Sequence, residues 1–401
     1  MNPKTWNATQ KLFAAVAFVF AMVWLWSSGV KDAVTWCGFA WVLVGAIRRR
    51  EKIYCGGLGW PLLAYLVFCA LSAWTSIDPK FSWRAYWKLI ELVAGFIALA
   101  NLLRPDRRSD VAARSIALAM IVAGAADAIR FAIDRHFDTH FFTDGRWDGS
   151  RYGFPTIAAA VHAAGFVLCA ALLLRARTIG QRLACAAGLG VIGWLLLGFE
   201  TRSVVLGIAA GFLVLLLAAA RDRKRAFKAI GLCSVACAVA LVASPSFRAR
   251  IVSGSFSDRV GIWNDAKNTI LFAPKVGKYF GVGYGHGIFL KVHEVAGRRH
   301  RAARQAYNHT HNMILEALVE TGWPGMLAWL ALLGTAAVRF VRAVRRADDE
   351  RRWTLAALAA ALVTLIVYGQ FSAFFALAPI FIFWNLLGVL AAAEAPPRTS
   401  P

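Results

Sequence analysis

Two histidines stand at the head of a short apolar segment in the last third of the chain. The segment Asn308–Gly325 reads NHTHNMILEALVETGWPG, and its apolar residues recur with the spacing of one helix face. Gly322 predicts the end of this helix, and Pro324 suits the first turn of the next one. His309 and His311 are therefore expected at or just before a helix N-terminus, which favours anions. A neutral histidine there could act as a base beside a bound phosphate; a histidine that only caps the helix is the alternative.

The same two histidines lack the spacing of a metal site. His309 and His311 are two residues apart, so on a helix they would point in different directions, and no HExxH motif is present. We therefore predict no metal. The glycine-rich stretch Gly281–Gly287 (GVGYGHG) resembles a nucleotide loop only superficially, because such loops need a strand before them and a helix after them. It predicts a tight turn with close backbone approach.

Three arginines are candidates for contact with an anion. Arg202 lies in the short connection Glu200–Ser203 between two apolar runs. An ionisable side chain at membrane depth is costly and is therefore a functional candidate; snorkelling to the lipid headgroups is the alternative. Arg146 and Arg151 flank a glycine-rich stretch, DGRWDGSRYGFP, where pairing with acidic neighbours is the alternative.

These residues belong to a chain that is too apolar for a water-soluble protein. Of its 401 residues, 59% are hydrophobic and 17% are charged, and the mean hydropathy is +0.56. Ordinary soluble proteins contain about 45–50% hydrophobic and about 25% charged residues. A soluble globule, a disordered chain and a disulfide-stapled domain are excluded. The seven cysteines lie almost entirely in apolar runs and are expected to be small apolar residues without disulfides.

The composition predicts an all-α, polytopic integral membrane protein with about twelve transmembrane helices. A helix needs about 20 mainly apolar residues to cross a bilayer. Asp127 and Arg130, three residues apart, are expected to pair within the fifth of these spans. The candidate spans lie near residues 12–29, 33–47, 58–75, 87–103, 111–133, 154–174, 182–199, 203–220, 226–243, 323–340, 353–373 and 376–393.

The basic residues orient the chain. Dense runs of Lys and Arg occupy every second connection, which predicts that these connections and both termini are cytoplasmic. The same rule accounts for the net charge of +23 without a nucleic acid partner. Spans in residues 1–243 and 323–401 then flank one long external loop, residues 244–322. The basic excess of that loop indicates an anionic partner, with attraction to anionic headgroups as the alternative.

Four groups of residues make the chain resemble the O-antigen ligase/polymerase superfamily. The members of this superfamily are bacterial inner-membrane glycosyltransferases. The resemblance implies a GT-C-like fold with about twelve spans and one large periplasmic loop, and it is strongest to the ligases. The matching residues are His309-Thr310-His311-Asn312 with Leu315, Glu320, Gly322 and Gly325; Asp258-Arg259 with Trp263 and Gly281–Gly285; Arg202 beside Ser203; and Arg151–Pro155.

The resemblance also implies a reaction. The donor would be an O-antigen linked to undecaprenyl pyrophosphate, and the acceptor would be a sugar hydroxyl of lipid A–core. Transfer would be inverting and metal-independent, without a cofactor, on the periplasmic face of the inner membrane. Arginine pairs with phosphate through two parallel hydrogen bonds, so Arg202 and Arg259 could hold the pyrophosphate in place of a metal. Arg146 and Arg151 are assigned to the same donor site.

The resemblance assigns the general base to the histidine pair. His311 is the first choice because Asn312 follows it, and His309 is the second. The helix N-terminus should lower the pKa of His311 and a bound phosphate should raise it, and we expect these effects nearly to cancel.

Other functions remain open at this stage. An O-antigen polymerase or a protein O-oligosaccharyltransferase of the same superfamily is the closest alternative, because the motifs are shared. A transporter of lipid-linked glycans would predict inverted repeats and broken helices, and no repeat stands out. A structural anchor would not need the external histidines and arginines.

Overall fold

The computed structural model describes residues 28–50, 52–103, 108–136, 142–143, 146–147, 155–176, 178–199, 201–218, 231, 257–271, 275–297 and 309–394. This part of the protein is helical apart from one short antiparallel hairpin of β1 (Phe142–Thr143) and β2 (Arg146–Trp147). The helices are α2 (Ser28–Arg49), α3 (Gly59–Trp74), α4 (Pro79–Leu102), α5 (Arg108–His136), α6 (Pro155–Arg175), α7 (Ile179–Phe199), α8 (Arg202–Ala218), α11 (Ser257–Leu271), α12 (Lys275–Phe280), α13 (Ile288–Gly297), α14 (Met313–Arg346), α15 (Asp349–Gly369) and α16 (Leu377–Glu394).

Most of the predicted spans coincide with observed helices. Those between residues 33 and 220 match α2 to α8, and the last three match α14, α15 and α16. The spans predicted at 12–29 and 226–243 lie largely outside the described residues. In the described part, six helices are long and apolar enough to cross a membrane, namely α4, α5, α6, α7, α14 and α15. The structure is thus that of a multi-pass membrane protein, while the total of twelve spans stays a prediction.

Small residues allow the central helices to approach closely. On α8, Gly207 and Gly211 face α15: a Cβ at Gly207 would lie 2.6 Å from the carbonyl oxygen of Thr364, and one at Gly211 would lie 2.9 Å from that of Ala360. Such a Gly-x-x-x-Gly face suits membrane helices, where packing rather than hydrophobicity drives association. Larger side chains here would force α8 away from α15.

A buried polar pair joins α5 to α6. Asp127 Oδ2 and His162 Nε2 lie 3.0 Å apart, and both side chains are 1% exposed. The His162 ring also stacks on Phe199 at 5.8 Å. The expected pairing of Asp127 with Arg130 is therefore wrong, since Arg130 instead lies 3.8 Å from Asp134, one turn further along. The partner of Asp127 comes from another helix because an interhelical contact lets both buried groups satisfy each other.

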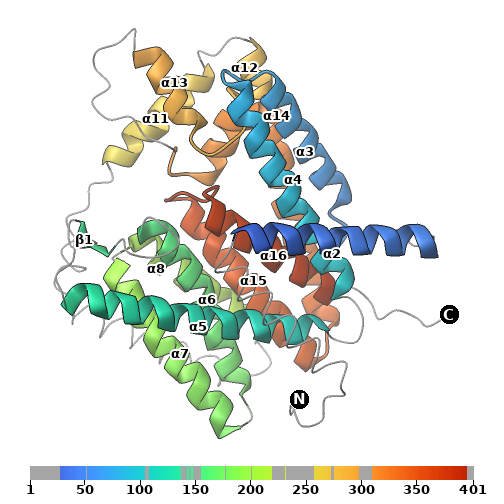
Figure 1. The fold of residues 1–401 in the computed structure, drawn as a ribbon, viewed down its shortest axis with the longest axis vertical. Helices are drawn as coiled ribbons and strands as arrows, with labels where there is room; N and C mark the ends of the chain where they lie inside the picture. Colours follow the sequence, from blue (N-terminus) through green and yellow to red (C-terminus); the bar gives the residue numbers. More distant parts are fainter. Residues whose placement is uncertain are drawn as a thin grey trace.

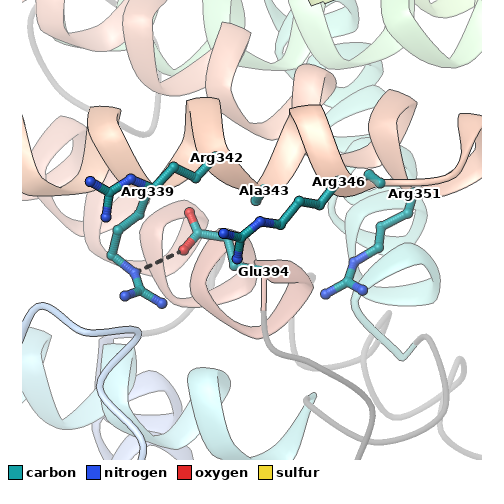
Figure 2. A pocket seen from close by; sticks show the side chains of 7 residues that line it. Arg339, Arg342, Ala343, Arg346, Arg351 and Glu394 are labelled. Carbon is teal, nitrogen blue, oxygen red and sulfur yellow. Dashed lines mark hydrogen bonds and ion pairs between the residues drawn. The ribbon is translucent and has the colours of Figure 1, made fainter.

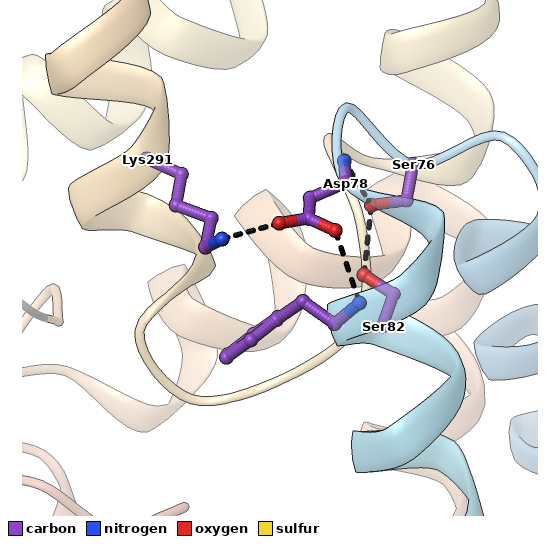
Figure 3. A network of polar contacts seen from close by, with 5 residues as sticks. Ser76, Asp78, Ser82 and Lys291 are labelled. Carbon is purple, nitrogen blue, oxygen red and sulfur yellow. Dashed lines mark hydrogen bonds and ion pairs between the residues drawn. The ribbon is translucent and has the colours of Figure 1, made fainter.

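The connections α11, α12 and α13 gather at the end of the molecule where α3, α4 and α14 meet (Figure 1). Lys291 of α13 forms an ion pair with Asp78, the residue that caps the N-terminus of α4 (Figure 3). This contact lowers the pKa of Asp78, and the Lys291 ammonium also lies 5.0 Å from the centre of the Phe81 ring. Helix α13 is thereby tied to the N-terminus of α4.

Candidate functional site

The turn before α14 carries the two histidines. Asn312 has an extended backbone, and its side chain accepts hydrogen bonds from two N–H groups of the first helical turn, at 3.0 Å each. The hydroxyl of Thr310, which is fully buried, donates to the Asn312 carbonyl at 2.9 Å. This is a regular N-cap, which satisfies N–H groups that have no partner within the helix. His309 and His311 therefore lie immediately before the helix N-terminus, as predicted.

The backbone of His311 is strained. Its φ angle is 53°, in the left-handed region that costs a non-glycine residue about 1–3 kcal/mol. The neighbouring Asn312 amide also donates to the Gln370 carbonyl at 3.4 Å, which ties the turn to the link between α15 and α16. Such strain persists where the surroundings hold it, and it is common at functional sites.

Two glycines position the histidine turn through a break in α14. Gly322 has a φ of 68° inside α14, so the helix kinks there, as the sequence predicts. A Cβ at Gly322 would lie 2.4 Å from the Tyr279 carbonyl, and one at Gly281 would lie 2.2 Å from the Glu320 carbonyl. The glycine-rich stretch is thus the close-packed turn that its composition predicts. This docking brings its last polar residue, His286, to the start of α14.

Three histidines form a row at this place. The ring centres of His286 and His309 are 5.0 Å apart, and those of His309 and His311 are 4.0 Å apart. His286 Nδ1 donates to Glu316 Oε1 at 2.9 Å, and the Glu316 side chain is 3% exposed. Both ring nitrogens of His309 are buried without a hydrogen-bond partner among the described residues, as is Glu316 Oε2. Sequence reasoning missed His286 and Glu316; the position of a histidine inside a glycine-rich turn was the available signal.

Two arginines approach the same row from other helices. Arg202 is the first residue of α8, and Arg259 lies in the first turn of α11. Burial, and then the charge of Arg202, lower the pKa of Arg259. The Arg259 guanidinium lies 6.0 Å from the centre of the Phe371 ring, in the link that also contacts the histidine turn. Arg259 also acts electrostatically on His311. The structure thus brings together Arg202, Arg259 and His311.

Residues 187–330 match the family model described as O-antigen ligase. The matched segment runs from α7 into α14 and contains both arginines, the glycine-rich turn and the three histidines. The match covers 144 of the 401 residues and supports membership of the O-antigen ligase superfamily. No curated protein matches the chain in sequence. The match indicates a glycosyltransferase-like activity of the O-antigen ligase or polymerase kind.

The pKa values of the three histidines at this site are shifted in different directions. Burial, and then the charges of Arg259 and His286, lower the pKa of His311 to about 4. Burial, and then the charges of its two histidine neighbours, lower the pKa of His309 to about 2. Burial also opposes the charged form of His286, but the hydrogen bond and the charge of Glu316 outweigh it and raise its pKa above the ordinary value. Burial and Arg259 both lower the pKa of His311, and the cancellation expected when a phosphate is bound beside it stays a prediction.

The remaining predicted site residues are not placed. Arg151 lies outside the described residues, and Arg146 lies in β2 with its side chain outside them. Both stay predictions. Among the described residues, no group of three or more His, Cys, Asp or Glu is arranged to hold a metal ion. The five described cysteines are free thiols; three are buried, and Cys37 is exposed on α2.

Proposed function

We propose that the protein transfers an O-antigen glycan from undecaprenyl pyrophosphate to a sugar hydroxyl of lipid A–core, at the periplasmic face of the inner membrane. The observation that carries this proposal is the convergence of Arg202, Arg259 and His311, which are separated by 57 and 52 residues in the sequence. Three separate elements thereby assemble two phosphate-binding groups and one base within the segment that matches the superfamily.

The arginines suit the donor. The pyrophosphate of a lipid-linked glycan carries two negative charges, and guanidinium groups bind phosphate oxygens in pairs. Arg202 and Arg259 are held near enough for the charge of one to disfavour that of the other. A bound dianion relieves this repulsion, so the arginine pair is more stable with a pyrophosphate bound than without one. The same charges then stabilise the pyrophosphate as it leaves, which a metal ion does in other transferases.

The transfer needs one base and no redox partner. The acceptor hydroxyl oxygen attacks the anomeric carbon of the donor from the side opposite the pyrophosphate. The bond from this carbon to the pyrophosphate oxygen breaks, and its electron pair leaves with undecaprenyl pyrophosphate. The hydroxyl proton passes to His311, and the configuration at the anomeric carbon inverts. His311 is neutral at neutral pH with a pKa of about 4, so it can accept this proton.

The other two histidines have different roles in this proposal. His309 has the lower pKa, about 2, and is therefore the weaker base of the two. Its buried, unpartnered ring nitrogens are satisfied when a hydroxyl of the acceptor or donor sugar enters the site. His286 and Glu316 act as positioning residues, because their hydrogen bond fixes the ring that packs on His309.

Deletion of the gene and examination of the lipopolysaccharide test this proposal. We expect lipopolysaccharide without O-antigen and an accumulation of full-length, lipid-linked polymer. A single O-antigen unit on lipid A–core would instead identify an O-antigen polymerase. Unchanged lipopolysaccharide with unglycosylated target proteins would identify a protein O-oligosaccharyltransferase. Retention of the lipid-linked glycan on the cytoplasmic side would identify a transporter.

A further inference from the structure

A second basic cluster lies at the end of α14 remote from the histidines. Arg339, Arg342 and Arg346 follow one another at spacings of three and four residues, so they share one helix face. Together with Arg351 of α15 and Glu394 of α16 they line a cavity of about 430 Å³ (Figure 2). Arg339, the lining residue nearest to the histidine turn along α14, follows Met313 by 26 residues, which corresponds to about 40 Å of helix. The cavity is therefore distinct from the site around the histidine turn.

Two of the four arginines are anchored at the edge of the cavity. Arg339 Nε donates to Glu394 Oε2 at 3.3 Å. Its guanidinium also lies against Gly57, where a Cβ would come within 2.2 Å of Arg339 Nη1. Gly57 has a φ of 68°, so glycine is required there both by the backbone and by this contact. Arg351 Nε donates to the Ala393 carbonyl at 2.6 Å.

The other two arginines have no hydrogen-bond or ion-pair partner in the part of the chain that the structure describes. Figure 2 shows a contact only between Arg339 and Glu394 among the side chains that line the cavity. Within the described residues, neither Arg342 nor Arg346 forms a hydrogen bond or an ion pair. Four guanidinium groups and one carboxyl group line the hollow, so its net charge is at least +3. An arrangement of this kind is stabilised by an anion that contacts several of the guanidinium groups at once.

We infer that this cavity binds the headgroup of an anionic phospholipid that carries two phosphates. α14 and α15 are candidate membrane spans and α16 is apolar, so the cavity lies where these helices leave the membrane, level with the headgroups. Basic pockets between membrane helices bind such headgroups, and a volume of 430 Å³ is that of a ligand site rather than of a single ion. Two phosphates also match a charge of +3 better than one. The inference does not rest on the proposed transfer reaction.

Binding of diphosphatidylglycerol to the purified, delipidated full-length protein tests the inference. Native mass spectrometry and thermal unfolding in detergent would compare this lipid with phosphatidylcholine. We expect diphosphatidylglycerol to bind preferentially and to raise the unfolding midpoint. Arg342→Gln combined with Arg346→Gln should weaken this binding on the order of 10-fold or more, because each arginine near a headgroup contributes to the attraction. Without lipid, the double variant should unfold at the wild-type midpoint, since neither side chain pairs with any of the described residues.

Arg345 provides the matched control. It lies beside Arg346 on the same exposed helix end but does not line the cavity. Arg345→Gln should retain the wild-type preference for diphosphatidylglycerol. If Arg345→Gln weakens lipid binding as much as the double variant does, general attraction of basic residues to the membrane accounts for the binding and the inference is overturned. Equal protection by free inorganic pyrophosphate at the same phosphate concentration would assign the cavity to a soluble anion instead of a lipid. Gly57→Ala displaces Arg339 without removing a charge. Unchanged lipid binding in both this variant and the double variant would show that the lipid does not bind in this cavity.

Discussion

Substitution of His311 gives the most direct test of the proposed base. A positioned general base contributes roughly 10²–10⁴-fold to a rate, so His311→Ala should reduce kcat by about that factor. At pH 7, a group with a pKa of about 4 is protonated in about one molecule in 1,000, so the wild-type base is available almost throughout. His309→Ala should reduce kcat less, because the lower pKa of His309 makes it the weaker proton acceptor.

The pH dependence of the same reaction reports which histidine acts. A base works in its neutral form, so kcat/KM should be flat above pH 5 and fall tenfold per pH unit below the pKa of about 4. Arg259→Gln removes a positive charge that lowers the pKa of His311, so the pKa of this imidazole should be higher in the variant. Because Arg259 also binds the donor in the proposed site, this pKa is measured by NMR titration of the imidazole without donor rather than from the rate of transfer.

The assay is transfer from a purified lipid-linked glycan to purified lipid A–core in detergent, with donor affinity measured separately. Donor affinity should survive His311→Ala, since the arginines hold the phosphates. An inactive His309→Ala beside a nearly normal His311→Ala would reverse the assignment of the base. High activity in both variants would refute base catalysis by this turn. Loss of donor affinity in His311→Ala would make the histidine a phosphate-binding residue instead.

Four further outcomes are expected. Arg202→Ala and Arg259→Ala should abolish transfer without loss of folded protein, and lysine at either position should rescue poorly because it lacks the bidentate fork; full activity of both lysine variants would show that charge alone suffices. Gly281→Ala should destabilise the protein by about 1–3 kcal/mol or more in thermal unfolding, because Gly281 has a φ of 77° and lies against the Glu320 carbonyl. Gly190→Ala should leave the stability unchanged, because the space around Gly190 is open. Transfer should persist in EDTA, and activity lost to chelation and restored by one divalent ion would contradict the arginine donor site. Lys278→Cys should react with an impermeant thiol reagent from the periplasm, and reaction only from the cytoplasm would invert the topology.

Local chemistry explains the parts of the site that the sequence predicted correctly. Asn312 caps the helix through its own neighbours, and Gly322 breaks the helix through its own backbone, so neither depends on distant residues. The glycine-rich turn is likewise local, because positive φ angles at four of its glycines need no tertiary partner. Periodicity of apolar residues also located most of the observed helices, since a span must satisfy its hydrogen bonds internally.

Long-range pairing could not be predicted in the same way. His286 meets Glu316 across 30 residues, and Asp127 meets His162 across 35. In both cases the sequence shows titratable residues but not the packing that brings them together. The Asp127 error illustrates the difficulty: a partner at helical spacing was available on the same helix, yet burial favoured a partner from the adjacent helix. The burial of His311 and its proximity to Arg259, which lower its pKa, were not predicted for a related reason, because both arise from packing between distant segments.

The electrostatic link between Arg259 and His311 gives the proposed mechanism an order of events. Without donor, the charge of Arg259 adds to burial and keeps His311 a weak base. A pyrophosphate bound by Arg202 and Arg259 places negative charge beside that guanidinium and offsets its effect on the imidazole, so the pKa of His311 rises toward its ordinary value. A rise of one pKa unit corresponds to about 1.4 kcal/mol of interaction between the donor and the protonated base. His311 therefore becomes a stronger proton acceptor when the donor is in place, and the charge that it gains on deprotonating the acceptor is stabilised by the departing pyrophosphate.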